Sequence, residues 1–238
     1  MPSAHQQQTV EQAQIGLTGP GADFRSLVQA IHVANISNLS LLHPRGKVLF
    51  AEGEPAQGIF ILRTGRATAS ISSSEGRVVI LQIAQGGAVL GLNSVLRNMC
   101  YNTTIKTIEP CRTEFIPRKA LVGLMARNQA AAEAISQILS RELAELTERV
   151  RSLLLPQTAI AKLARLLLDW SEQSGTNNSH TLTITRSFTH EEFAQMICSS
   201  RETVTRLLAI LNKRQIIRVT SDSIFICDRA GLQSIAIG

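Results

Sequence analysis

Side chains that can read the edges of DNA bases recur at helical spacing in residues 201–213. At about 100° per residue, the polar side chains of this segment fall on one narrow arc, opposite an apolar arc. An arginine can donate two hydrogen bonds to guanine, and a glutamate accepts one from cytosine. The pattern predicts a helix that reads G·C pairs, the alternative being a solvated amphipathic helix. The candidate DNA-binding residues are Ser200, Arg201, Glu202, Thr205, Arg206 and Lys213.

A second short helix precedes this one, separated by a turn of only three residues, 198–200. Thr189 and Glu192 have the spacing of a capping box, and Ser199 with Glu202 repeats that spacing before the next helix. Because the turn is so short, the two helices must cross steeply. The segment therefore predicts a helix-turn-helix.

The residues after this motif predict a β-hairpin wing. Residues 216–219 and 224–226 are rich in β-branched side chains and flank a turn at 220–223. Between residues 201 and 218, five basic residues stand against one acidic residue. Positive charge is therefore concentrated where the phosphates of a duplex would lie.

Residues 46–116 have the pattern of a β-barrel or rolled sandwich, because short β-rich runs alternate with glycine-containing turns. Before them, residues 24–36 have the spacing of a short helix. Residues 1–22 have no periodicity and are expected to form a flexible arm. The predicted strands cover residues 48–50, 59–62, 67–71, 78–83, 88–92, 102–108 and 113–116.

A long helix with one apolar stripe is predicted over residues 131–155, and the stripe follows a heptad rhythm. A narrow stripe needs only one narrow partner, which favours a homodimer over packing within one domain. A two-fold dimer would present two recognition helices, so the operator is expected to be a pseudo-palindrome with half-sites about one helical turn apart. The stripe consists of Leu139, Leu143, Leu146, Val150 and Leu153, and its charged flanks of Arg141, Glu142, Glu145, Glu148, Arg149 and Arg151.

Pro156 is expected to end this helix, with a hinge at residues 155–157. A helix that runs to Trp170 then begins the C-terminal domain, and Trp170 is expected in its core. The predicted fold class is α+β: an antiparallel β-roll (a double-stranded β-helix or jelly roll), a long dimerisation helix and a winged helix-turn-helix domain. The predicted parts are a flexible arm (1–22), a β-roll sensor domain (23–130), the dimerisation helix (131–155) and the DNA-binding domain (156–238).

The length of 238 residues and a hydrophobic content of 44% allow two modest domains. No run approaches the roughly 18 apolar residues of a membrane span, and the Gln-rich N-terminus lacks the core of a secretory signal. We therefore expect a cytoplasmic protein with no membrane partner. The net charge of +6 and the pI near 9.6 favour an anionic partner without identifying it as nucleic acid.

The four cysteines, Cys100, Cys111, Cys198 and Cys227, stand far apart and form no Cys-x-x-Cys pair. With no histidine at metal-ligand spacing, neither a zinc site nor a disulfide framework is predicted. Each cysteine is expected to be a buried small hydrophobe, although Cys198 takes a turn position where glycine is usual. A thiol redox pair of Cys100 and Cys111 is the alternative.

Two stretches of the chain resemble the Crp/Fnr family of bacterial transcription regulators. The glycine-bounded runs at residues 46–53 and 58–65 are common to cyclic-nucleotide-binding-like domains, whereas Ser-Arg-Glu-Thr-Val-Thr-Arg at residues 200–206 is specific to this family's recognition helix. The resemblance spans about residues 24–230. It implies a DNA-binding regulator whose Arg201, Glu202 and Arg206 read a TGTGA-like half-site, with RNA polymerase as a protein partner.

The effector pocket departs from the family pattern. Members that bind cyclic AMP use a Gly-Glu pair for the ribose hydroxyls and an Arg-Ser or Arg-Thr pair for the cyclic phosphate. The matching positions here are Gly91-Leu92, followed by Asn93, and Asn102-Thr103. Each missing polar partner costs about 1–3 kcal/mol when buried, so the sequence predicts no cyclic AMP binding in the usual manner.

The other sensor chemistries of the family also lack their ligands. An iron–sulfur sensor uses clustered cysteines in the N-terminal arm, and this arm has none, so no iron–sulfur cluster is predicted. Haem would need an axial ligand, and His43 is the only histidine near the roll. A haem-based or thiol-based redox sensor stays as the alternative within the family, and the cofactor is unidentified.

The competing class is a cupin-like metal enzyme, since rolled β-domains also house that chemistry. Cupins need at least three histidines in a fixed pattern, whereas residues 44–179 contain no histidine. No Gly-x-Ser-x-Gly elbow or phosphate-binding loop is present in the sequence either. We therefore expect no enzymatic activity. A domain that only scaffolds protein contacts is a third possibility, which a failure to bind DNA would favour.

Overall fold

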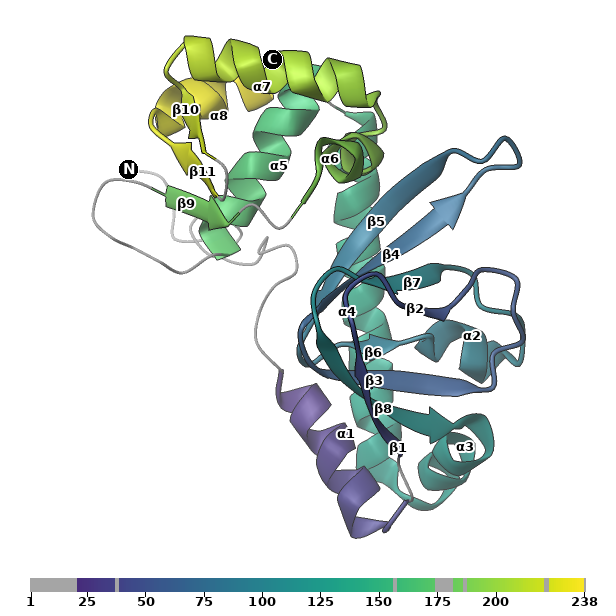
Figure 1. Ribbon diagram of the computed structural model, residues 1–238. Helices are drawn as coiled ribbons and strands as arrows, with labels where there is room; N and C mark the ends of the chain where they lie inside the picture. Colours follow the sequence, from purple (N-terminus) through teal and green to yellow (C-terminus); the bar gives the residue numbers. More distant parts are fainter. Residues whose placement is uncertain are drawn as a thin grey trace, which may run out of the picture.

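The computed structural model describes residues 21–36, 39–155, 158–173, 182–185, 188–220 and 223–237. Within these ranges the fold is α+β, as predicted: an antiparallel β-domain, a long helix beside it and a C-terminal domain with a helix-turn-helix (Figure 1). The predicted arm over residues 1–22 falls outside the described residues except at its end. The predicted hinge at residues 155–157 falls outside them except for Leu155.

Two four-stranded antiparallel sheets form the β-roll, one in the order β1-β8-β3-β6 and the other in the order β2-β7-β4-β5. In the first sheet Ile59 of β3 pairs with Ile116 of β8, and both side chains are fully buried. The strands are β1 (Leu39–His43), β2 (Val48–Phe50), β3 (Gly58–Thr64), β4 (Arg66–Ser72), β5 (Val78–Gln85), β6 (Val89–Leu90), β7 (Thr104–Thr107) and β8 (Cys111–Pro117).

Each predicted strand run overlaps one strand of the roll, but two details of the prediction were wrong. Strand β1 was not predicted, because Leu39 and Leu42 are 61% and 76% exposed and the run lacks the alternation of a half-buried strand. The run 88–92 was too long. Gly91 takes a positive φ of 82°, which ends β6, and helix α2 (Leu92–Arg97) begins at the next residue.

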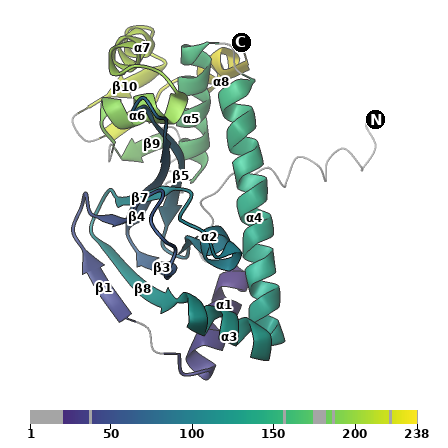
Figure 2. The same ribbon diagram turned by 90° about the vertical axis from the view of Figure 1, so that its right-hand side faces the viewer.

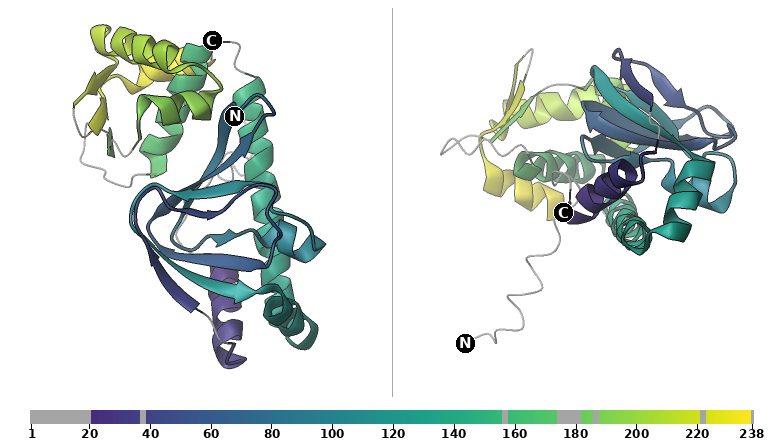
Figure 3. Two further views of the ribbon diagram at one scale, coloured as in Figure 1. Left: turned by 45° about the vertical axis from the view of Figure 1, so that its right-hand side comes forward. Right: turned by 90° about the horizontal axis from the view of Figure 1, so that it is seen from below.

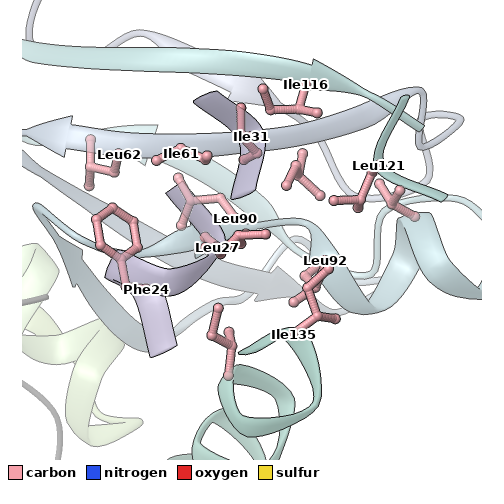
Figure 4. Packing of buried hydrophobic residues seen from close by; sticks show 14 of the residues in the cluster. Phe24, Leu27, Ile31, Ile61, Leu62, Leu90, Leu92, Ile116, Leu121 and Ile135 are labelled. Carbon is pink, nitrogen blue, oxygen red and sulfur yellow. The ribbon is translucent and has the colours of Figure 1, made fainter. Parts of the chain in front are cut away.

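The core of the roll is closed by helices α1 (Ala22–Val33) and α3 (Arg118–Arg127) together with α4 (Gln129–Leu154). Phe24, Leu27 and Ile31 lie on one side of α1, and Figure 4 shows them pointing toward residues such as Ile61 and Leu90 of the strands. Burying a side chain of this size contributes about 1.5–3 kcal/mol. The roll therefore depends on helices that flank it in the sequence on both sides.

Helix α4 (Gln129–Leu154) runs along the roll and continues to the C-terminal domain (Figure 2). Its N-terminus is capped by Asn128, whose side chain accepts a hydrogen bond from the Ala131 amide at 2.9 Å. Ala134, Ile135 and Ile138 then bury the first half of the helix in the core of the roll. Charged and exposed residues dominate the second half.

The C-terminal domain packs four helices and a small sheet around a second core cluster. Trp170 is 8% exposed within this cluster, as predicted. The predicted wing is present as an antiparallel pair of strands, although two residues of its turn, 221–222, lie outside the described residues. Strand β9 and helix α8 were not predicted. The elements are α5 (Ala159–Gln173), β9 (Leu182–Thr185), α6 (His190–Ile197), α7 (Arg201–Lys213), β10 (Ile217–Val219), β11 (Ser223–Ile226) and α8 (Arg229–Ile237).

The prediction that all four cysteines are buried was wrong. Only Cys111 is buried, at 2% exposure, whereas Cys100, Cys198 and Cys227 are exposed. The exposed three sit at chain reversals and strand ends rather than inside elements, for example Cys198 in the turn between α6 and α7. A small side chain at such a position fits a tight backbone without entering a core.

Candidate DNA-binding surface and effector region

Helix α6 begins at the predicted capping box. The Glu192 amide donates to Thr189 Oγ1 at 3.2 Å, and the Thr189 amide donates to Glu192 Oε2 at 2.7 Å. These reciprocal bonds satisfy two amides that the first helical turn leaves without partners, and a cap of this kind contributes about 1 kcal/mol. The start of the motif is therefore fixed by local sequence.

The turn that follows α6 sets where α7 begins, and here the predicted cap was one residue off. Cys198 takes the left-handed conformation with φ of 53°, and its amide donates to the Ala194 carbonyl. The cap of α7 is Ser200, whose hydroxyl accepts from the Thr203 amide at 3.2 Å, and not Ser199. The chain leaves the left-handed turn at Ser199, so the first residue with cap geometry is Ser200.

Helix α7 divides sharply into a buried and an exposed side. Val204, Leu207, Leu208 and Leu211 are all less than 9% exposed and belong to the core of the domain. The predicted base-reading residues lie on the other side and are all exposed: Ser200, Arg201, Glu202, Thr205, Arg206 and Lys213. The structure therefore brings the predicted set together on one surface, at the end of the molecule farthest from α1 and α3 (Figure 1).

Two local contacts shape this surface. A hydrogen bond from its own backbone amide, with help from the Ser200 hydroxyl and the Arg201 charge, lowers the pKa of Glu202, so its side chain is a carboxylate at neutral pH. Thr205 Oγ1 donates to the Arg201 carbonyl at 2.9 Å and lies 2.8 Å from His190 Nδ1 at the start of α6. His190 was not predicted as part of the surface, because its contact crosses from one helix to the other.

The wing is joined to the recognition helix. The Val219 amide of β10 donates to Asn212 Oδ1 of α7 at 3.2 Å. Arg218 stacks over the ring of Phe225, with its guanidinium carbon 5.0 Å from the ring centroid. The wing thus holds an exposed cation beside α7, in keeping with a surface that meets phosphates.

The apolar stripe predicted on α4 is exposed along its middle. Leu143, Leu146 and Val150 are 67%, 40% and 53% exposed. Leu139 is half-buried against the core of the roll, and Leu153 is half-buried. The neighbouring Leu154 and Leu155 are exposed and extend the stripe toward the C-terminal domain. A row of exposed leucines on one helix is a surface that another protein chain can cover.

At the predicted effector pocket an aromatic ring packs against the helix start. A side chain at Gly91 would lie only 2.7 Å from the ring of Tyr101, which stacks on Phe50 with centroids 3.8 Å apart. The Tyr101 hydroxyl donates to the Gly58 carbonyl at 2.5 Å, and burial raises the pKa of Tyr101. This buried ring was missed in the sequence, where nothing marks Tyr101 as facing Gly91.

The predicted pocket residues divide between core and surface. Leu92 is 1% exposed and part of the core of the roll, whereas Asn93 and Asn102 are exposed and Thr103 is half-buried. The Asn102 amide donates to the hydroxyl of Ser94, which ties this loop to α2. The residues lie near one another, but the side chains aligned with the family's carboxylate and guanidinium are an apolar group and an amide.

Comparison with known proteins decides the family. The sequence model described as "Cyclic nucleotide-binding domain" matches residues 42–128, and the one described as "Crp-like helix-turn-helix domain" matches residues 161–235. The "CRP-like cAMP-activated global transcriptional regulator" of Mycobacterium tuberculosis is 29% identical over 185 residues, which are 78% of this chain and 82% of that protein. The chain belongs to the Crp/Fnr family. It is a DNA-binding transcription regulator of the Crp/Fnr type.

Further relatives and solved structures agree with this assignment. The "Global nitrogen regulator" of Synechococcus elongatus is 24% identical over 177 residues, or 74% of this chain and 79% of that protein. Among solved structures, FixK2 from Bradyrhizobium japonicum matches with a TM-score of 0.71 at 18% identity, over 84% of this chain and 98% of that chain. The c-di-GMP-responsive regulator CLP of Xanthomonas campestris matches with a TM-score of 0.73 at 16% identity, over 85% and 98%. These structures support the fold alone.

In this Crp/Fnr protein, both a carboxylate of α4, Glu145, and a cation of α4, Arg149, contact β5. Glu145 Oε2 accepts from Gln82 Nε2 at 2.7 Å, and burial, with help from Glu145, raises the pKa of Glu142 to about 7. Arg141 is drawn toward Asp23 of α1, at 2.5 Å, and lies 3.9 Å from Glu145. A phosphate brought beside Glu145 would meet a carboxyl group, while the neighbouring guanidinium of Arg141 is already paired with Asp23.

The described residues show where the side chains considered as haem or metal ligands lie. His43, weighed as a haem ligand, lies with its Nε2 2.9 Å from Thr113 Oγ1, and burial lowers its pKa. Within the described ranges no three His, Cys, Asp or Glu side chains are grouped to hold a metal ion. Nor does any described helix have the length and apolar character to cross a bilayer.

Replacing Glu142 with glutamine should make the protein more stable at alkaline pH. The folded state holds the Glu142 proton up to about pH 7, whereas the unfolded chain releases it near 4.5, so this group contributes stability below about pH 4.5 that is lost as the pH rises toward 7. Glutamine cannot ionise. The melting temperature of Glu142→Gln should exceed that of wild type at about pH 8 and match it near pH 4.5.

Glu133, exposed on the same helix, provides the control. Glu133→Gln should follow the wild-type pH profile, measured by circular dichroism melts. Parallel profiles for wild type and Glu142→Gln would contradict the buried-carboxyl assignment.

Proposed function

We propose that this Crp/Fnr protein is a homodimeric regulator that works in the cytoplasm and binds a pseudo-palindromic operator with TGTGA-like half-sites. The observation that carries the proposal is the division of α7, whose apolar side is buried while Arg201, Glu202 and Arg206 are exposed together. Two arginines and a carboxylate on one helical face offer donors for guanine and an acceptor for cytosine. Each bidentate contact contributes about 1–3 kcal/mol of discrimination.

The exposed stripe of α4 supports the dimer. Leucine and valine side chains left in water each forgo about 1.5–3 kcal/mol that burial would contribute. A second copy packed along the same stripe would bury Leu143, Leu146 and Val150 twice over. Parallel two-fold pairing along α4 would place both copies of α7 at the same end of the assembly, as a palindromic operator requires.

We propose that the β-roll responds to a signal other than cyclic AMP bound in the family's usual manner. The name of the Mycobacterium relative makes cyclic AMP the first candidate to consider. Against it stand the apolar Leu92, the amide of Asn102 and the ring of Tyr101 against Gly91. The cofactor or ligand is left unassigned, and RNA polymerase is the expected protein partner by family resemblance.

Two variants should distinguish a residue that reads bases from one that contacts phosphates. Arg201→Ala should lower the preference for one G·C pair by about 1–3 kcal/mol, because a bidentate donor is lost. Lys213→Ala, at the last turn of the same helix, should weaken binding to all duplexes alike and reduce the salt slope by about 1. Fluorescence anisotropy on matched and single-mismatch duplexes at several salt concentrations measures both. Equal losses for Arg201→Ala on both duplexes would refute its reading role.

Removing the middle of the stripe should dissociate the dimer. The double variant Leu143→Ala with Leu146→Ala removes four leucines from a two-fold interface, so the dimer dissociation constant should rise at least about a hundredfold. Leu42→Ala is the control, since Leu42 is 76% exposed on β1, on the opposite side of the roll from α4 (Figure 2). Sedimentation velocity gives the result. An unchanged dimer in the double variant would remove α4 from the interface.

A further inference from the structure

The C-terminal domain rests directly on the β-roll, beside the second half of α4 (Figure 3, left). Helix α6 packs against β5. Ile80 of β5 and Ile108 after β7, 3% and 4% exposed, are buried in the core cluster of the C-terminal domain rather than in that of the roll. Two residues of the sensor domain thus complete the core of the DNA-binding domain.

One side chain of α4 joins both domains at this contact. Arg149 Nη2 donates to the Ile80 carbonyl of β5 at 3.1 Å and also donates to the Met196 carbonyl of α6. Met196 lies in the last turn of α6, whose carbonyls have no partner within the helix and carry the negative end of its dipole. A guanidinium with donors in a fixed fork can hold two carbonyls of different elements at once.

Arg149 donates two hydrogen bonds at this contact, but one of its other donors has no partner in the part of the chain that the structure describes. Among the described residues, Arg149 Nε is buried and has no acceptor. Burial lowers the pKa of Arg149, while Asp169 and Cys198 nearby act in the opposite direction. For a buried cation, the desolvation cost of one unpaired donor offsets part of the free energy that its other hydrogen bonds contribute. The unpaired Nε therefore lowers the net contribution of Arg149 to the docked arrangement.

We propose that Arg149 is a positioning residue for DNA recognition, which fixes α6, and through it α7, relative to α4 and the β-roll. The three elements that it joins come from the three parts of the chain: β5 from the sensor, α4 from the dimer helix and α6 from the DNA-binding motif. A shift of β5 relative to α4 would change the carbonyl that Arg149 can hold and so release α6. A signal that moves β5 of the β-roll would thus reach the recognition helix α7 through Arg149 and α6.

Arg149 also lies next to the exposed apolar stripe of α4. Val150, its neighbour in sequence, lies on the exposed stripe, so the same turn of helix that would meet the second copy also holds α6. The distance between two copies of α7 would then be set by rigid contacts instead of by the linker after α4. This inference rests on the proposed homodimer for its effect on operator affinity, but the docking contact exists within one chain.

The test compares Arg149→Met with Arg149→Lys and with Arg151→Met. Arg151, two residues further along α4, has a 62% exposed side chain and pairs only with Glu148 of the same helix among the bonds found in the described structure, so it is a matched control. Trp170, the only tryptophan of the chain, stacks on Phe188 at 4.6 Å, and Phe188 lies beneath Arg66 of the roll. Its fluorescence therefore reports docking without any DNA.

Arg149→Met should weaken binding to the selected operator about tenfold or more, because fewer molecules hold α7 in place, while binding to a random duplex changes little. Its Trp170 emission should shift to the red and become more accessible to acrylamide. Arg149→Lys keeps the charge and the donors of one nitrogen but lacks the planar guanidinium, so it should recover part of both readouts, and Arg151→Met should behave as wild type.

The proposal is overturned if Arg149→Met keeps wild-type operator affinity and emission, or if Arg151→Met loses as much. If Arg149→Met does not fold, Arg149→Lys provides the test. Wild-type operator affinity and wild-type Trp170 emission in Arg149→Lys would overturn the proposed role of the guanidinium. If the wild type binds no duplex at all, the proposed function fails instead. In that case the Trp170 comparison still tests the docking contact.

Discussion

Helix α4 packs against both the β-roll and the C-terminal domain, and the rest of the structure depends on these two contacts. Its first half is buried in the roll through Ala134, Ile135 and Ile138. Its second half is only partly covered, with an apolar stripe facing water on one side and Arg149 reaching the C-terminal domain on another. Because these contacts lie on one continuous helix of 26 residues, we expect a movement of α4 at one contact to displace the others.

Local rules were sufficient where a short segment determines its own structure. The Thr189–Glu192 capping box, the two faces of α7 and the hairpin wing all follow from spacing within a few residues. The assignment of Ser199 as a cap failed because the left-handed Cys198 moves the start of α7 by one residue, which spacing alone does not reveal. Element types were thus predictable, while their exact ends depended on backbone conformations at the turns.

The contacts on which the proposals rest were not predictable, because they join residues far apart in the chain. Arg149 looked like a solvated flank of the stripe, since sequence does not tell which side of α4 meets β5 and α6. Tyr101 against Gly91 and His190 against Thr205 are further pairings of this kind. In the effector region the sequence predicts which polar partners are absent, and the structure adds the ring of Tyr101 beside Gly91.

In the proposed dimer, a pair of chains joined along α4 presents two copies of α7 to one operator. The decisive experiment is selection from a pool of random duplexes by the purified full-length protein, with and without cyclic AMP. We expect enrichment of a pseudo-palindrome whose TGTGA-like halves lie about one helical turn apart, and the same enrichment when cyclic AMP is added. A single unpaired half-site, no enrichment, or enrichment only with cyclic AMP would contradict it.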